Sequence, residues 1–156
     1  MLISITPGAT PPGPPVFLAG QNPAGAPDAR CGPKDLKVVE RRVAQVAGLF
    51  RANTVRVFDR LNRRVSITFA TQRLFDTVAA AQNFVFDHPG QVPTSGIVTV
   101  VNEGDAGGVP RRYYPDAVVE LVDGSHLGLA TCHHYQITAA AAQNQDPSVA
   151  QFSPST

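Results

Sequence analysis

The sequence predicts a mainly β protein of the α+β type: an antiparallel sheet, small sandwich or barrel with one packed helix and a long extended N-terminal arm. Apolar and polar residues alternate in several later runs, which is typical of strands with one buried face. Only residues 77–88 combine a capping residue with apolar positions at helical spacing. The first 33 residues hold eight of the fourteen prolines and five glycines, a composition that cannot build its own core.

These features divide the 156 residues into an arm at 1–33, a β-rich core domain at 34–138 and a polar tail at 139–156. The length fits a single domain. Within the arm, the apolar patches 1–5 and 16–19 can each add a strand to an exposed sheet edge. That edge belongs either to a neighbouring subunit or to the chain's own core. If it belongs to a neighbour, deletion of the arm should leave a folded protein that assembles poorly.

The first half of the core is expected to contain strands. Residues 35–50 fit a helical repeat and, in part, an alternating strand, but their β-branched side chains favour the strand. Residues 55–71 alternate more clearly on both sides of Leu61, Asn62 and Arg63, so a β-hairpin with its turn at these three residues is predicted.

The helix follows this hairpin. Asp76 or Thr77 caps it, and the sequence His88-Pro89-Gly90 is expected to end it. Its buried stripe is expected to contain the apolar residues at helical spacing and the last residue of the segment, namely Val78, Ala81, Val85 and His88, with Phe84 beside them.

Further strands are predicted at 97–101, 111–114, 117–122 and 127–138. Residues 102–108 are expected to form a polar hairpin tip, Pro115-Asp116 to interrupt a strand, and Gly124-Ser125 to form a turn. One face of the last strand is expected to carry alternate residues, namely Leu129, Thr131, His133, Tyr135 and Ile137.

Charge and hydropathy exclude several classes of protein. The net charge of +1 provides no overall field for nucleic acid or membrane, and no run of about 18 apolar residues predicts a membrane span. The N-terminus lacks a secretory signal pattern. Residues 41–73 contain eight arginines and one acid, whereas 87–123 contain six acids and two arginines. These halves either neutralise each other within one subunit or join copies head to tail.

No catalytic or metal motif is present. Cys31 and Cys132 match no metal or redox spacing, and they form either a disulfide or two free thiols. Cys132 and His134 share one strand face but lack a second pair of metal ligands. No Gly-x-Ser-x-Gly elbow predicts a hydrolase, and residues 102–108 lack the lysine of a phosphate loop. We therefore expect neither enzymatic activity nor a cofactor.

Four segments together suggest a family. They are the predicted hairpin around Leu-Asn-Arg-Arg-Val-Ser-Ile-Thr-Phe, the helix Thr-Val-Ala-Ala-Ala-Gln-Asn-Phe-Val-Phe-Asp-His, the turn Val-Pro-Thr-Ser-Gly and the closing strand His-His-Tyr-Gln-Ile. In this pattern residues 50–137 resemble small tail-associated structural proteins of tailed bacteriophages. The resemblance implies a non-enzymatic virion subunit, assembled in the host cytoplasm, that forms a ring or tube with its own copies and other virion proteins.

Assembly of this kind predicts subunit contacts in the arm and between the arginine-rich and acidic parts of the chain. The interface candidates are Ile3, Ile5, Val16, Phe17, Leu18, Arg60, Arg63, Arg64, Asp105 and Asp116. Direct contact with nucleic acid is not expected, because the aromatic residues near the arginines alternate as buried residues do. The other function class left open is a soluble cytosolic binding module, with a disordered arm, for a small ligand or partner protein.

Overall fold

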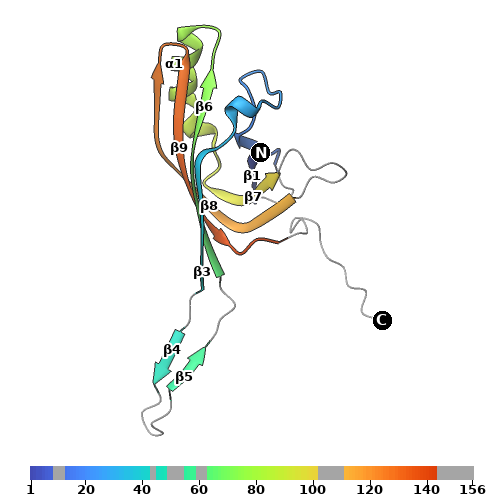
Figure 1. Ribbon diagram of the computed structural model, residues 1–156, viewed down its shortest axis with the longest axis vertical. Coiled ribbons are helices and arrows are strands. Elements are labelled where there is room, and N and C mark those ends of the chain that lie inside the picture. Colours follow the sequence, from blue (N-terminus) through green and yellow to red (C-terminus); the bar gives the residue numbers. More distant parts are fainter. Residues whose placement is uncertain (9–12, 43–44, 49–54, 59–62, 102–110, 144–156) are drawn as a thin grey trace, which may run out of the picture.

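The computed structural model describes residues 1–8, 13–42, 45–48, 55–58, 63–101 and 111–143 (Figure 1). A seven-stranded antiparallel sheet has the strand order β2-β1-β7-β8-β9-β6-β3, and β4 and β5 form a separate two-stranded sheet. The mainly β prediction is therefore confirmed. The elements are β1 (Leu2–Pro7), β2 (Val16–Ala19), the short 3-10 helix η1 (Ala29–Cys31), β3 (Lys34–Arg42), β4 (Gln45–Gly48), β5 (Val55–Phe58), β6 (Arg63–Leu74), α1 (Val78–Gln91), β7 (Ser95–Val101), β8 (Arg111–Leu127) and β9 (Ala130–Ala140).

The core lies on one face of this sheet. Along β6 and β9 the buried side chains occupy alternate positions, as the strand periodicity requires. Phe69 and Tyr135 are directly opposite each other in the register, and their stacked rings have centroids 5.1 Å apart. The predicted inward face of the last strand is confirmed at Thr131, His133, Tyr135 and Ile137, whereas Leu129 is exposed in the turn before β9.

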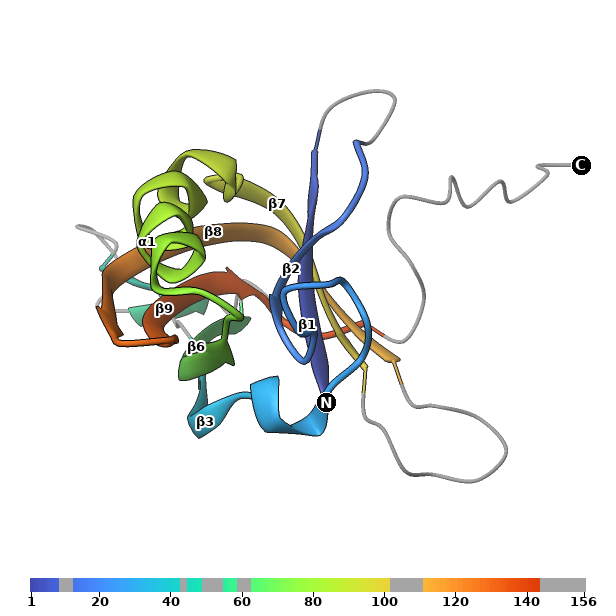
Figure 2. The same cartoon turned by 90° about the horizontal axis from the view of Figure 1, so that it is seen from above.

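The sheet curves until its two ends approach each other (Figure 2). β2 and β6 are separated by four strands in the sheet order, yet the guanidinium of Arg73 on β6 donates to the main-chain oxygen of Leu18 on β2 at 3.0 Å. α1 packs against β8 and β9 near this junction. The fold is therefore a rolled sheet with one helix.

Of the two alternatives for the apolar patches of the N-terminal arm, the structure shows pairing with the chain's own core. β1 lies between β2 and β7 in the sheet, and Ile3, Ile5 and Leu18 are fully buried in the chain's own core. The prolines do not prevent this arrangement, because residues 2–6 and 16–19 contain none and keep every backbone donor. Residues 1–33 are thus largely part of the core domain.

The predicted hairpin over residues 55–71 is also wrong. β5 pairs with β4, whereas β6 pairs with β3 and β9. Alternation identifies a strand and its buried face, but it does not identify the neighbouring strand. The expected strand over residues 35–50 is divided between β3 and β4. Leu61 and Asn62 lie outside the described residues, and Arg63 begins β6.

β8 is longer than predicted. Asp116 has a φ of 51°, and the pairing between β7 and β8 shifts register near it, so Pro115-Asp116 forms an irregularity within one strand. Gly124 and Ser125 also remain within β8, and the chain turns at Gly128, whose φ is 60°. The predicted hairpin tip at 102–108 lies outside the described residues.

The helix and the last strand both extend beyond their predicted ends. Thr77 caps α1 by accepting from the amide of Ala80 at 3.1 Å, as expected, but the helix continues through Pro89 to Gln91. An amide of Val92 that donates to the carbonyl of His88 at 3.1 Å closes this last turn. Ala81 and His88 are buried as predicted, whereas Val78 is exposed.

The tail was predicted to begin two residues too early, at residue 139, because β9 extends to Ala140. Gln143 and Tyr113 then exchange two main-chain hydrogen bonds, of 2.8 and 2.9 Å. Residues 144–156 lie outside the described part of the chain.

The place of β1 in the core leads to a stability prediction. Ile5→Ala should lower the free energy of unfolding by about 2–5 kcal/mol, because it leaves a cavity where a fully buried side chain stood. Leu127→Ala is the control: its side chain is 88% exposed, so the loss should stay within about 0.5 kcal/mol. Urea unfolding measures both changes, and equal losses would contradict the burial of β1. Deletion of residues 1–33 should prevent folding.

Candidate functional site

The predicted interface residues do not gather on one surface. Ile3, Ile5 and Leu18 belong to the core, so their assignment to a subunit interface is corrected. Val16 and Phe17 are half-buried on β2, and Arg64 and Asp116 are exposed on β6 and β8. Arg60 and Asp105 lie outside the described residues, and of Arg63 only the place in the backbone is described.

The most unusual group of residues is a buried polar cluster on the inner face of the sheet, made of Thr71, Arg73, Thr131 and His133. They form two adjacent cross-strand pairs of β6 and β9, with Thr71 opposite His133 and Arg73 opposite Thr131. None is more than 5% exposed. Five of their side-chain atoms have no hydrogen-bond partner in the described part of the chain: both hydroxyl oxygens, Nη1 of Arg73 and the two ring nitrogens of His133. Buried polar atoms are rarely left in this state.

Helix α1 covers the polar cluster with two rings. The Phe84 ring packs against the guanidinium of Arg73, with 4.9 Å between the guanidinium carbon and the ring centroid, and edge-on against His133 at 5.2 Å. Nε2 of His88 and the hydroxyl of Tyr135 share a hydrogen bond of 2.5 Å. These contacts hold α1 on the sheet. They also place the buried His88 of this helix close to the charge of Arg73.

Arg73 connects the sheet, the helix and β2. Its Nη2 donates to the carbonyls of Leu18 at 3.0 Å and Phe17 at 3.4 Å. Within the described part of the chain, no carboxylate pairs with this guanidinium. A buried charge without an opposite charge is costly. The carbonyl oxygens and the Phe84 ring offset part of this cost.

The electrostatics of the polar cluster keep both buried histidines neutral at pH 7. Burial, with the positive charge of Arg73, lowers the pKa of His88 to about 3 and that of His133 to about 4. Burial also raises the pKa of the Cys31 and Cys132 thiols, both of which are free. Among the described residues, no serine or cysteine hydrogen-bonds to either histidine.

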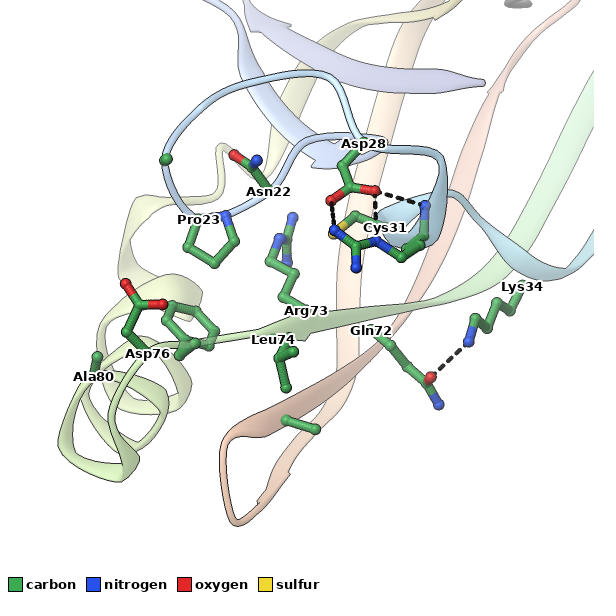
Figure 3. Close-up of a pocket in the computed structure, with 14 residues that line it drawn as sticks. Asn22, Pro23, Asp28, Cys31, Lys34, Gln72, Arg73, Leu74, Asp76 and Ala80 are labelled. Atoms are coloured by element: carbon green, nitrogen blue, oxygen red, sulfur yellow. Dashed lines mark hydrogen bonds and ion pairs between the residues drawn. The ribbon is translucent and has the colours of Figure 1, made fainter.

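A cleft of about 790 Å³ adjoins Arg73 (Figure 3). Its walls are the turn that contains Pro23, the η1 region, the end of β6 and the first turn of α1. The cleft lining includes the cations Arg30, Lys34 and Arg73 and the acids Asp28 and Asp76. The cleft is therefore the described concave surface nearest to the polar cluster.

Sequence reasoning did not identify Arg73 or the cleft. The available signal was the alternation along β6, where Val65, Ile67, Phe69 and Thr71 lead to Arg73 at the next inward position. Metal binding was considered for Cys132 and His134, but His134 instead pairs with Asp123 on the exposed face. In the described ranges, no three His, Cys, Asp or Glu side chains are arranged to hold a metal ion.

No protein-family model, curated protein or solved structure matches this chain. None of the helices described here has the length and apolar character needed to cross a membrane.

The neutral histidines predict a loss of stability in acid. Unfolding raises their pKa values toward 6.5, so the unfolded chain binds more protons below that pH. Stability from these groups should be complete above about pH 6.5 and decrease as the pH falls to about 3–4, by up to about 1.4 kcal/mol per pH unit for each histidine. The charges facing them are Arg73 from β6, which strengthens the effect, and Asp123 and His134 from β8 and β9, which act on His133 in opposite directions.

Urea unfolding between pH 7 and pH 5 measures this dependence. His88→Leu should reduce its slope, whereas His126→Gln, at an exposed site, should not change it. The same slope in the wild type and the His88 variant would contradict the buried neutral imidazole.

Gly124 lies against His133 of the polar cluster, and this contact leads to a second prediction about stability. A Cβ there would lie 2.7 Å from Cδ2 and 2.8 Å from Nε2 of the fully buried His133. Gly124→Ala should therefore cost about 1–3 kcal/mol, most of which disappears when His133→Ala is already present. Gly90→Ala is the control, since nothing lies within 4 Å of its added Cβ in α1 and a small gain is expected. Thermal unfolding of the wild type, the two single variants, the double variant and the Gly90 control checks this, and additive losses would contradict the contact.

Proposed function

We propose that this chain is a non-enzymatic structural subunit of a bacteriophage-like virion, a tail component that assembles into a ring or tube with its own copies and other virion proteins. The observation that carries the proposal is the open edge of the sheet at β3. This nine-residue strand pairs with β6 on one side, and no described strand pairs with its other side. A free strand edge is a template for strand addition by another chain.

Six of the nine residues of β3 are charged, and its two exposed apolar side chains are the ones that support strand addition. Leu36 and Val38 are 37% and 50% exposed, and they line an apolar pocket of about 130 Å³ together with Ile67 and Tyr114. A partner strand paired with β3 would cover both residues. Main-chain hydrogen bonds would supply affinity, and the pocket would select the side chain that enters it.

A second apolar surface lies elsewhere on the molecule. We call it the apolar tip; it consists of Leu74, Val78, Leu127 and Leu129. Ala130 pairs with Leu74 on one side and with Leu127 on the other, and the amide of Phe75 donates to the carbonyl of Leu129. Leu74 and Leu127 are 65% and 88% exposed. Two different adhesive surfaces on one subunit favour head-to-tail contacts, which generate rings or open tubes.

The sequence resemblance to tail-associated virion proteins supports assembly into a ring or tube. The uneven distribution of charge along the chain supports a head-to-tail arrangement of the copies. A second candidate function, a binding module for a small ligand or partner protein, is favoured by the cleft beside Arg73.

Mass in solution and negative-stain electron microscopy test the assembly. The wild type should form species larger than the 16.5 kDa monomer as its concentration rises, with rings or tubes in the images. Val38→Asp should shift the mass toward the monomer, because a charge at the β3 edge opposes strand addition. Val122→Asp, at a similarly exposed position on β8, should not. A wild type that stays monomeric at every concentration would overturn the proposal in favour of the binding module.

A further inference from the structure

The cleft has a charged base and an apolar side. Arg73 lies beneath it, between the Pro23 turn and Cys31 in Figure 3. The apolar residues Leu74, Phe75, Ala80 and Ala130 also line the cleft. Because Leu74 also belongs to the apolar tip, the cleft and the tip are continuous. A segment seated in the cleft would therefore extend an interface made at the tip.

The base of the cleft lacks a negative charge. Arg73 is 95% buried, its Nη2 donates to main-chain carbonyls, and no described residue hydrogen-bonds to its Nη1. A guanidinium pairs best with a carboxylate, which accepts hydrogen bonds and neutralises the charge at once. A ligand that carries a carboxylate would supply both a hydrogen-bond acceptor for Nη1 and a negative charge.

The rest of the lining favours an anion. Asp28 is already engaged, because it accepts hydrogen bonds from the side chain of Arg30 at 3.1 and 3.2 Å. Lys34 donates to the neutral side chain of Gln72, at 2.6 Å, so that contact does not neutralise its charge. Of the five charged groups in the lining, Arg73 and Lys34 remain as positive charges, opposed by Asp76 beside α1.

We propose that this cleft binds a carboxylate presented by an acidic segment of a second copy of the chain, with Arg73 as its principal contact. The inference rests on the proposed assembly. The acids of the chain are concentrated in residues 87–123, far in sequence from the cleft residues, so a head-to-tail arrangement can bring them to a neighbour's cleft. Residues 101–109 carry Glu103 and Asp105 among small residues, and they are the segment assigned to the cleft.

Access to Nη1 requires a small movement of the wall, because this atom has no exposed surface. The turn at residues 22–26 is the part best suited to move. Its residues from Pro23 to Ala26 are exposed, and the hydrogen bonds of the turn are local, between Asn22 and Gly25 or Ala26. Few contacts are therefore lost when it shifts.

Binding of a synthetic peptide with the sequence of residues 101–109 tests the proposal. The titration uses the full chain at a concentration where its mass is monomeric, so that failure of assembly and failure of the cleft are distinguished. A control peptide carries Glu103→Gln and Asp105→Asn. Fluorescence anisotropy of the labelled peptides gives affinities for the wild type, Arg73→Gln, Lys34→Gln and, as a control outside the cleft, Arg111→Gln.

The acidic peptide should bind the wild type, and the control peptide should bind at least about tenfold more weakly. Arg73→Gln should weaken binding by at least about tenfold, and Lys34→Gln, which removes an exposed side chain and should leave the fold intact, by a smaller factor. Arg111→Gln should have no effect. Equal binding of the two peptides, unchanged binding in the Lys34 variant, or binding of free succinate without binding of the peptide would overturn the proposal.

Discussion

Arg73 makes the contact on which the rest of the structure depends. Its guanidinium donates to the main-chain oxygens of Phe17 and Leu18, so it joins β6 to the far end of the same sheet. A charge buried this deeply needs hydrogen-bond partners, and here the carbonyls of β2 accept from Nη2, while Nη1 has no partner among the described residues. This one side chain contacts β2, which lies at the other end of the curved sheet, and Phe84 of α1.

Its surroundings explain why the helix remains regular beyond the expected stop. His88 is inserted between Phe84 and Tyr135, with the His88 and Phe84 rings stacked at 4.6 Å, and it lies against His133. These contacts offset the cost of Pro89 in the last turn of the helix. The same desolvation that holds the imidazoles neutral ties the stability of the helix–sheet junction to pH.

Local patterns in the sequence predicted the features that neighbouring residues determine, namely the buried face of a strand and the start of the helix. The alternation of Val65, Ile67 and Phe69 identified a strand and its buried face, and Thr77 identified the start of the helix. Pairing partners could not be found in this way, since β5 pairs with β4 rather than with β6. Counting prolines over 33 residues was misleading because they leave β1 and β2 free to pair. Arg73 was missed because a charged residue usually marks the solvent face of a strand.

The proposed assembly follows from where the rolled sheet ends. Arg73 covers part of β2, whereas β3 keeps an open edge with half-exposed Leu36 and Val38. Hydrogen–deuterium exchange of the β3 amides, compared between dilute and concentrated protein, tests this claim most directly. Residues 34–42 should become protected as the mass rises, while exposed amides distant from the edge keep their exchange rates. Growth in mass without protection of β3 would contradict this claim.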